Sequence, residues 1–397
     1  MAYNVTSGFQ SEISKDAPTL VRRFYIGDSD YSSFVDKFPK FKKQWNEIKP
    51  TTLNIKLSNH GKTFNFFKSD PVTLVNSCRI SYGVQYAVGS EETLDFFRGK
   101  ISDATFIDGT MVSLKLEDKM KAFAERLVGT NESPIDYTGS DFAPHEVAWW
   151  IATSFGGLSA VESTSNLDID YAAWLEWAEV FSDGTVTMEG YFKGQKVANV
   201  MRRIGRLTDS SIVIENDKLT FARFSSNSSA AFDIGSRCIM RASLNISDTN
   251  IINNQIWNAG YDITSADFFV VVEETNQASV NSYGRHSQVE DDQIVWYVDS
   301  VSALNIAQRK TTIFGVPIQR YQLETTLRPI TRQVGDTISF KSDILDVDED
   351  VFRVMGYELD LDKGIMKIDA DASQLTVAFI LDDSTMGHLD KNYNGLG

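Results

Sequence analysis

The hydrophobic pattern of the first third of the chain predicts short antiparallel strands. Leu53, Ile55 and Leu57 alternate with polar residues, as in a strand with one buried face, and a turn sequence follows at 59–62. Because the next apolar runs are short and closely spaced, we expect a small antiparallel barrel or sandwich over about 53–118. With a short helix after Glu117, this first β-domain is placed at 53–128. The further strands are expected at 72–75, 77–82, 94–101 and 112–116.

The middle of the chain changes to helical spacing. Val147, Trp150, Ile151 and Phe155 recur at three- and four-residue intervals, and a second helix is expected over 193–207. Two short apolar runs, 212–214 and 219–221, predict a hairpin. The region 129–239 is therefore interpreted as a mixed α+β insert.

The last third returns to strand patterns. A helix is expected over 300–314, and Lys363-Gly364 predicts a tight turn between two strands. The predicted fold class is α+β, mostly β, with two antiparallel β-domains flanking the mixed insert. The further divisions are an N-terminal arm and lead-in strand at 1–52, a second β-domain with helix at 240–382 and a C-terminal tail at 383–397. The strands of this third are expected at 268–273, 294–297, 337–341, 351–361, 365–370 and 375–381.

Composition narrows the functional classes. With 42% hydrophobic and 23% charged residues, the 397-residue chain is globular and long enough for several domains. The formal net charge of -16 argues against general nucleic-acid affinity, which needs clustered Lys and Arg. Cys78 and Cys238 give neither a disulfide framework nor paired zinc-ligand spacing, so synthesis in a reducing cytosol is inferred. Neither a signal peptide nor a membrane-spanning segment is expected.

Two clusters are candidates for chemistry. Asp343, Asp346, Asp348, Glu349 and Asp350 form an acidic loop that could hold calcium, although it lacks the glycine and distal glutamate of the twelve-residue calcium loop, and a solvated loop is the alternative. Asp168 and Asp170, near Trp174 and Trp177, would suit a carbohydrate site with two carboxylates and aromatic platforms, but packing is the alternative.

Other catalytic motifs are missing from the sequence. The four histidines have no partner at metal-ligand spacing, and neither a Gly-x-Ser-x-Gly elbow nor a glycine-rich phosphate loop occurs. We therefore expect a non-enzymatic protein without a cofactor.

Several short segments occur in a distinctive order. Gly27-x-x-Asp30-Tyr31-Ser32 comes first, then Phe97-Arg98-Gly99-Lys100-Ile101, then Tyr283-Gly284-Arg285 and finally Gly335-Asp336. Their order resembles that of the baseplate or tail-tip hub proteins of tailed bacteriophages, and the matching segments are spread over nearly the whole chain.

The resemblance implies two tail-tube-like β-barrel domains and assembly as a trimeric ring at the distal end of the tail. Such a ring joins the tail tube or distal tail protein to a central spike or fibre, and the implied partners include the tape measure protein. DNA would be met only in transit during genome ejection, and the virion protein would be made in the host cytoplasm. Two alternatives stay open: a six-fold distal tail ring protein, and a carbohydrate-binding or carbohydrate-cleaving tail protein that serves host attachment.

A ring-forming protein needs apolar side chains that become buried on assembly. Phe66 with Phe67, and Trp149 with Trp150, are the candidate assembly residues, with an ordinary core position as the alternative.

Overall fold

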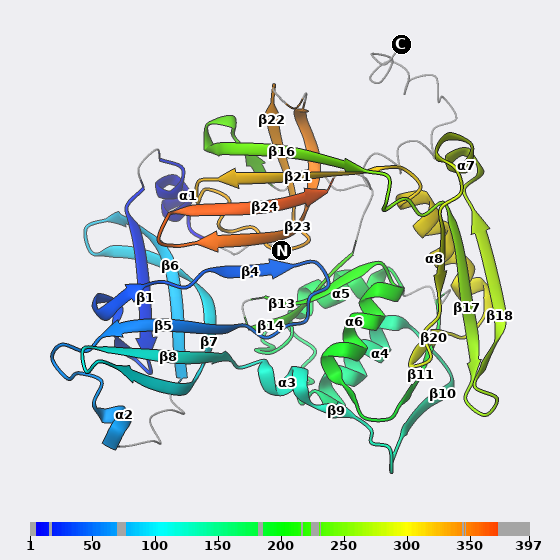
Figure 1. Ribbon diagram of the computed structural model, residues 1–397, viewed down its shortest axis with the longest axis horizontal. Helices are drawn as coiled ribbons and strands as arrows, with labels where there is room; N and C mark the ends of the chain where they lie inside the picture. The colour runs from blue at the N-terminus through cyan, green and yellow to red at the C-terminus, as the bar shows by residue number, and fades with distance from the viewer. Residues whose placement is uncertain are drawn as a thin grey trace.

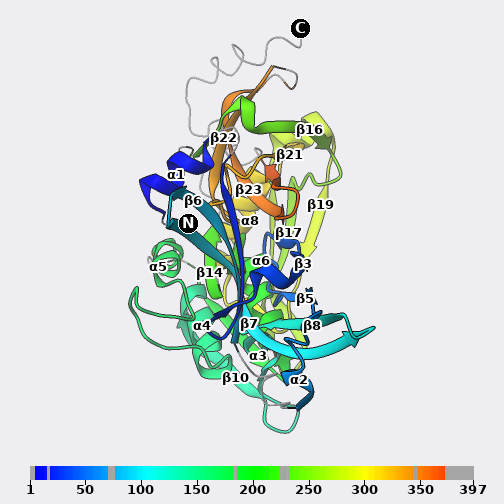
Figure 2. The same ribbon diagram turned by 90° about the vertical axis from the view of Figure 1, so that its left-hand side faces the viewer.

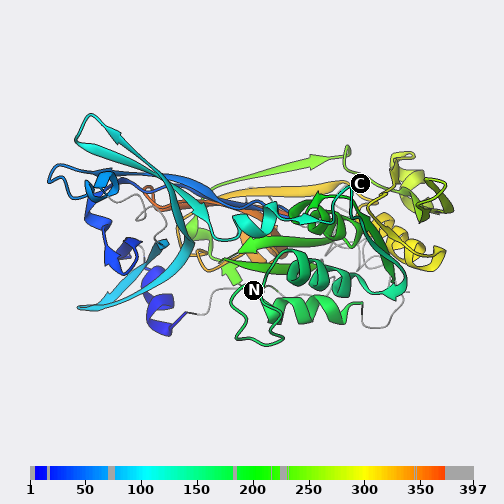
Figure 3. The same cartoon turned by 90° about the horizontal axis from the view of Figure 1, so that it is seen from below.

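The computed structural model describes residues 5–15, 18–69, 77–181, 186–215, 217–223, 230, 232–343, 345 and 347–371. Figure 1 shows two curled sheets, one above the other, and the mixed insert lies to the right of the lower sheet and below the upper one. A third, small sheet with helix α8 lies at the far end from the first sheet (Figure 3). The fold is mostly β, as the sequence pattern predicted.

The first sheet is antiparallel, with strand order β2-β1-β6-β7-β8-β5-β3. The predicted alternation is confirmed, since Leu53, Ile55 and Leu57 of β5 are buried. Gly99 lies where β7 crosses β8, and a Cβ there would meet the Glu117 carbonyl oxygen at 2.1 Å, so only glycine fits. The strands are β1 (Leu20–Ile26), β2 (Ser29–Asp30), β3 (Val35–Lys37), β5 (Thr52–Ser58), β6 (Ser77–Ala87), β7 (Ser90–Ile107) and β8 (Met111–Asp118).

The second sheet has the order β15-β22-β23-β24-β21-β16, and β4 (Phe41–Gln44) also pairs with β23. The predicted turn at Gly364, where φ is +67°, joins β23 to β24. The expected strands at 72–75 and 375–381 lie outside the described residues. The strands are β15 (Phe232–Ile234), β16 (Ile239–Ser247), β21 (Ile318–Thr325), β22 (Thr337–Ser342), β23 (Val347–Asp360) and β24 (Ile365–Asp371).

The two sheets share one hydrophobic core. Phe24 and Leu114 of the first sheet belong to the same buried cluster as Tyr321, Phe340 and Phe352 of the second. Helix α1 (Ser7–Ile13) adds Phe9 to this cluster from beside β6 (Figure 2). Because the cluster is continuous, the sheets are expected to be held together by apolar burial rather than by a flexible linker.

The insert has its own core, built around helix α6 (Val197–Leu207). Val197, Val200, Met201 and Ile204 are buried, as their spacing predicted. The helix begins four residues later than expected, because β12 (Gln195–Lys196) pairs with β9 (Leu127–Val128). No described helix is both long and apolar enough to cross a membrane. The other elements are α3 (Lys121–Glu125), β10 (Ile135–Phe142), α4 (Pro144–Trp150), α5 (Tyr171–Glu179), β11 (Met188–Phe192), β13 (Ser210–Glu215) and β14 (Lys218–Arg223).

Residues 254–313 pack with the insert, which differs from the expected division at residue 240. Trp257, Val272, Tyr297 and Ile306 belong to the insert core, because β20 pairs with β11 and α8 packs on β17 and β18. Hydrophobic spacing predicted the strand at 294–297 and the helix at 300–314. It does not specify which of the two cores these elements join. These elements are β17 (Asn254–Asp262), β18 (Asp267–Thr275), α7 (Gln277–Tyr283), β19 (Ser287–Glu290), β20 (Val295–Tyr297) and α8 (Ser300–Ile313). Strands β18, β17 and β19, in that order, form the small third sheet.

Candidate functional site

The two carboxylates of the candidate carbohydrate site have structural partners. Asp168 accepts a hydrogen bond from the backbone N–H of Ser159 at 3.0 Å and lies 3.5 Å from the Lys119 ammonium. Asp170 caps the N-terminus of α5 by accepting from the backbone N–H of Ala173 at 3.2 Å. Both side chains therefore stabilise the segment that leads into α5.

The two tryptophans of that candidate site lie in different environments. Trp177 is 1% exposed, donates its indole N–H to Ser210 Oγ at 2.7 Å and stacks on Phe221, so it is a core residue and not a sugar platform. Trp174 is half-buried and packs against Trp149, with ring centroids 4.7 Å apart. Tyr171 stacks on Trp174 as well, which gives a small aromatic cluster between α4 and α5.

The candidate assembly residues all pack within the chain. Phe67 is buried, and Phe66 packs beside it at a ring-centroid distance of 4.3 Å. Trp150 stacks on Tyr137 of β10, also at 4.3 Å. Phe66, Trp149 and Trp150 keep a partly exposed surface, and their burial by a neighbouring copy stays a prediction.

The acidic loop of 343–350 is only partly described. Asp343 and Asp350 are exposed, Asp346 lies outside the described residues, and Asp348 lies in β23 opposite Lys341. Among the residues that the structure describes, no group of three or more His, Cys, Asp and Glu side chains could hold a metal ion.

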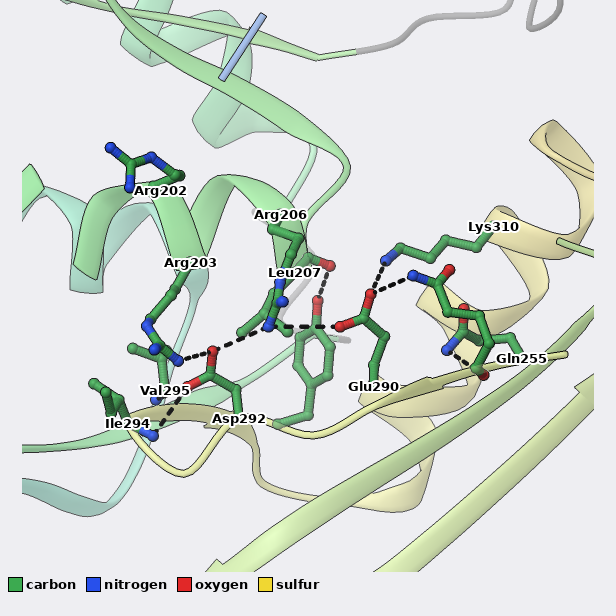
Figure 4. Close-up of polar contacts among 12 residues, drawn as sticks. Arg202, Arg203, Arg206, Leu207, Gln255, Glu290, Asp292, Ile294, Val295 and Lys310 are labelled. Carbon is green, nitrogen blue, oxygen red and sulfur yellow. Dashed lines mark hydrogen bonds and ion pairs between the residues drawn. The ribbon is translucent and has the colours of Figure 1, made fainter. Parts of the chain in front are cut away.

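A charge network joins the insert helix α6 to the segment that follows β19 (Figure 4). Asp292 is 1% exposed at its side chain and lies 2.6 Å from Arg203 and 3.2 Å from Arg206. Its other oxygen accepts from the backbone N–H groups of Ile294 and Val295 at 3.0 and 3.2 Å. A buried carboxylate with this many donors holds the start of β20 against α6.

The same network extends to helix α8. Arg206 lies 3.5 Å from Glu290 of β19, and Lys310 of α8 lies 3.4 Å from Glu290 on the other side (Figure 4). The Tyr297 hydroxyl donates to the Leu207 carbonyl oxygen at the end of α6. These contacts fix the third sheet and α8 to the insert, so the network has a positioning role that sequence spacing did not reveal.

Exposed apolar side chains mark two surfaces that the sequence interpretation missed. Met240 and Ile246 of β16 are 51% and 57% exposed, and β16 forms the edge of the second sheet among the described strands. A hollow of about 540 Å³ lies between the start of β16 and Leu345. On the third sheet, Phe269 and Val271 of β18 are 72% and 66% exposed. For β18 the available signal was the run of apolar residues on both faces of the strand, whereas β16 alternates like an ordinary half-buried strand.

At the sequence level, no family model matches the chain and no curated protein does. Solved structures match over nearly its full length. The tail protein from Neisseria meningitidis MC58 is 13% identical with a TM-score of 0.56, and the match covers 90% of this chain and 99% of that one. The 43 kDa tail protein of prophage MuSo2 from Shewanella oneidensis is 9% identical with a TM-score of 0.52 over 89% and 98% of the two chains.

A third solved structure agrees. The prophage tail protein gp18 from Listeria monocytogenes EGD-e is 12% identical with a TM-score of 0.51, and the match covers 93% of this chain and 98% of that one. Identities this low show a shared fold. The order of the short sequence segments implied the fold of phage tail proteins, and this expectation is confirmed: the chain has that fold.

Proposed function

We propose that the protein is a non-enzymatic structural component of a phage tail, located in the virion as a hub at the tail tip. It forms a ring that joins the tail tube or distal tail protein to a central spike or fibre, and DNA leaves through the ring. The observation that carries this proposal is the pair of curled sheets on one core, in a fold shared with tail proteins over nearly the whole chain.

Open sheet edges support assembly. A strand at an edge presents unpaired backbone N–H and C=O groups, and proteins normally cover or disrupt such edges. Strand β16 has nine residues and carries the exposed apolar side chains Met240 and Ile246. In a ring, a neighbouring copy covers this edge, and rotational symmetry allows every copy to be covered in the same way.

The outer face of the second sheet supports passage of DNA without binding. A hollow on this face, of about 340 Å³, contains three basic and three acidic side chains. Balanced charges on a chain with a net charge of -16 do not create the basic stripe that retains phosphates. We place this face toward the channel. The six residues are Lys42, Arg241, Lys367, Glu324, Glu358 and Asp369.

Native mass spectrometry, with imaging of phage particles in which this chain is labelled, tests the proposal. A mass of about three 44.5 kDa chains and a label at the tail tip support the hub. Six chains at the tube end would favour the distal tail ring instead. A protein that stays monomeric at high concentration and is absent from virions contradicts both. No observation favours the carbohydrate alternative, because Trp177 is buried and both Asp168 and Asp170 have structural partners.

A further inference from the structure

Strand β16 runs along one edge of the second sheet, and among the described strands it pairs with β21 alone (Figure 1). Its inner face is incompletely covered. Ala242 and Leu244 pack on the shared core but are only half-buried, and Ile246, on the same face, is 57% exposed. A further strand beside β16 would cover this row of apolar side chains and pair the backbone groups of the edge.

The hollow of about 540 Å³ marks the place where such a strand is missing from the described sheet. One wall of the hollow comes from the first residues of β16, and the other comes from the end of β22 and from Leu345. These strands belong to opposite ends of the strand order, and β15 pairs only with residues 338–340 of β22. An additional strand in this gap would close the curled sheet and remove its edge.

Residues 375–381, which lie outside the described residues, have the sequence pattern that this place requires. Every second residue of the segment is a large apolar one, so one face of the predicted strand suits a core. A seven-residue strand is long enough to pair with most of β16, which has nine residues. The residues of the apolar face are Leu375, Val377, Phe379 and Leu381.

Charges favour one orientation of the segment on β16. Asp382 and Asp383 follow the segment directly, and the exposed Arg237 and Arg241 lie at the start of β16. An antiparallel strand brings these carboxylates to the arginines, whereas a parallel strand would place them at the opposite end of β16. With the apolar face turned to the core, Leu375, Val377 and Phe379 then lie opposite Ile246, Leu244 and Ala242.

The connection after β24 is too short for the segment to reach β16 of its own chain. Asp371, the last residue of β24, is level with Asn245 of β16, because both lie opposite Arg320 of β21. The far side of β16 is three strand spacings away, or about 14 Å, and the residues from Asp371 to Leu375 span at most about 14 Å when fully extended. No length would remain for the chain to reverse its direction. Short connections of this kind favour exchange of a segment between copies.

We propose that residues 375–381 of one copy add an antiparallel strand to β16 of the next copy, with Phe379 in the hollow. This inference rests on the proposed ring and names the contact that closes it. In a ring, each copy gives its segment to one neighbour and receives the segment of the other, so every β16 edge is covered in the same way.

Cysteine cross-linking of the full chain tests the proposal. Directly opposite residues of antiparallel strands have Cα atoms about 4.5–5.5 Å apart, which suits a disulfide. In a Cys238→Ser background, Ile246→Cys/Leu375→Cys should form disulfides between copies on mild oxidation, with masses of two and three chains under denaturing, non-reducing conditions. The matched control is Ile246→Cys/Thr376→Cys, which should cross-link at least tenfold less because Thr376 lies on the other face of the strand.

Native mass spectrometry of the same samples separates this inference from the proposed ring. A ring whose chains do not cross-link would overturn the strand exchange and leave the ring standing. A disulfide formed within one chain would likewise show that the segment is not exchanged. A wild type that stays monomeric would contradict the ring itself, and the exchange with it.

Hydrogen exchange provides a second test if the cysteine variants do not assemble. In the full-length variant Phe379→Asp, a charge in the apolar hollow should release the added strand. Peptide 239–247 should then exchange at least tenfold faster than in the wild type, while peptides from β5 should be unchanged. Leu389→Asp, the same kind of change beyond the segment, should leave peptide 239–247 protected. Equal protection of this peptide in the wild type and in Phe379→Asp would overturn the proposal.

Discussion

The Lys310 ammonium is close to both the Trp257 ring and the Glu290 carboxylate. Its nitrogen is 4.8 Å from the centroid of the ring and 3.4 Å from Glu290 Oε1, and the Lys310 side chain is only 5% exposed. A buried lysine is stabilised by an opposite charge and by an aromatic face together. Since Trp257 is in β17, Glu290 in β19 and Lys310 in α8, this contact connects the small sheet to its covering helix.

Replacing Lys310 by Met should destabilise the protein, because a buried carboxylate loses a partner. We expect a loss of about 3 kcal/mol in the free energy of unfolding, at the lower end for breaking a buried ion pair because Arg206 still reaches Glu290. Urea denaturation measures this loss. Lys310→Met/Glu290→Gln should recover part of it, and Arg285→Met, which breaks an exposed pair with Glu273, should change stability by less than about 1 kcal/mol. Equal losses for Lys310→Met and Arg285→Met would show that the buried ion pair of Lys310 does not stabilise the protein.

Gly335→Ala tests why glycine occurs in the Gly335-Asp336 segment. Gly335 has φ of +95°, and an added Cβ would approach Ala222 Cβ of β14 at 2.5 Å. We expect a loss above the roughly 1 kcal/mol that a left-handed conformation alone costs a non-glycine residue. Gly89→Ala is the matched control, since Gly89 has φ of +76° with no atom within 4 Å of the added Cβ. Thermal unfolding measures the loss of stability in both variants, and the difference between the two losses is the cost of the close approach to Ala222. Similar losses would show that this cost is negligible.

The sequence predicted local structure better than it predicted contacts between distant segments. The hairpin of β13 and β14 follows from two apolar runs separated by polar residues, and α8 follows from its helical spacing and the capping Asp299. These features depend on neighbouring residues alone. The place of residues 254–313 on the insert core depends on contacts such as Trp257 with Tyr297, which no local pattern encodes.

The candidate sites were predicted less well for the same reason. A tryptophan beside carboxylates suits a binding platform or a core, and contacts with the distant Ser210 and Phe221 show that Trp177 is a core residue. The charge network around Asp292 includes Arg203 of α6 and Glu290 of β19, which are far apart in the sequence and belong to different elements. Exposure at Ile246 depends on where the sheet ends, and this is a property of the whole topology.

The stability of the protein should carry a pH dependence due to Asp217. Burial, more than any other cause, raises its pKa from 3.8 to about 7 in the folded state, so the unfolded state loses its proton first as pH rises. Asp217 therefore lowers stability progressively between about pH 4 and pH 7, by an upper bound of about 4 kcal/mol for three pKa units, and no further above that.

Urea unfolding of wild type and Asp217→Asn at pH 5 and pH 8 measures this dependence. The variant should be more stable than the wild type at pH 8 and closer to it at pH 5. Other carboxyl groups, such as Glu117 beside Lys121, have a lowered pKa and act in the opposite direction, but they are common to both proteins and cancel in the difference. A difference that is the same at both pH values would show that Asp217 does not titrate in this range.

Ile246→Lys should weaken assembly without unfolding the chain. Ile246 is 57% exposed near the end of β16, so a lysine there has little effect on the core of one chain. In a ring that covers β16, the same lysine would place an unpaired charge in an apolar contact, which costs several kcal/mol per interface. Analytical ultracentrifugation should show dissociation at concentrations at least tenfold above those for the wild type.

Val88→Lys is the comparison for this variant, because Val88 is fully exposed at the turn between β6 and β7, away from β16. It should leave the oligomer unchanged, and both variants should have wild-type circular dichroism and similar urea midpoints. If Ile246→Lys assembles as the wild type does, a neighbouring copy does not cover β16, and the ring must close through other surfaces. In that case the Phe269 and Val271 face of β18 becomes the next surface to alter, since its apolar side chains are still more exposed.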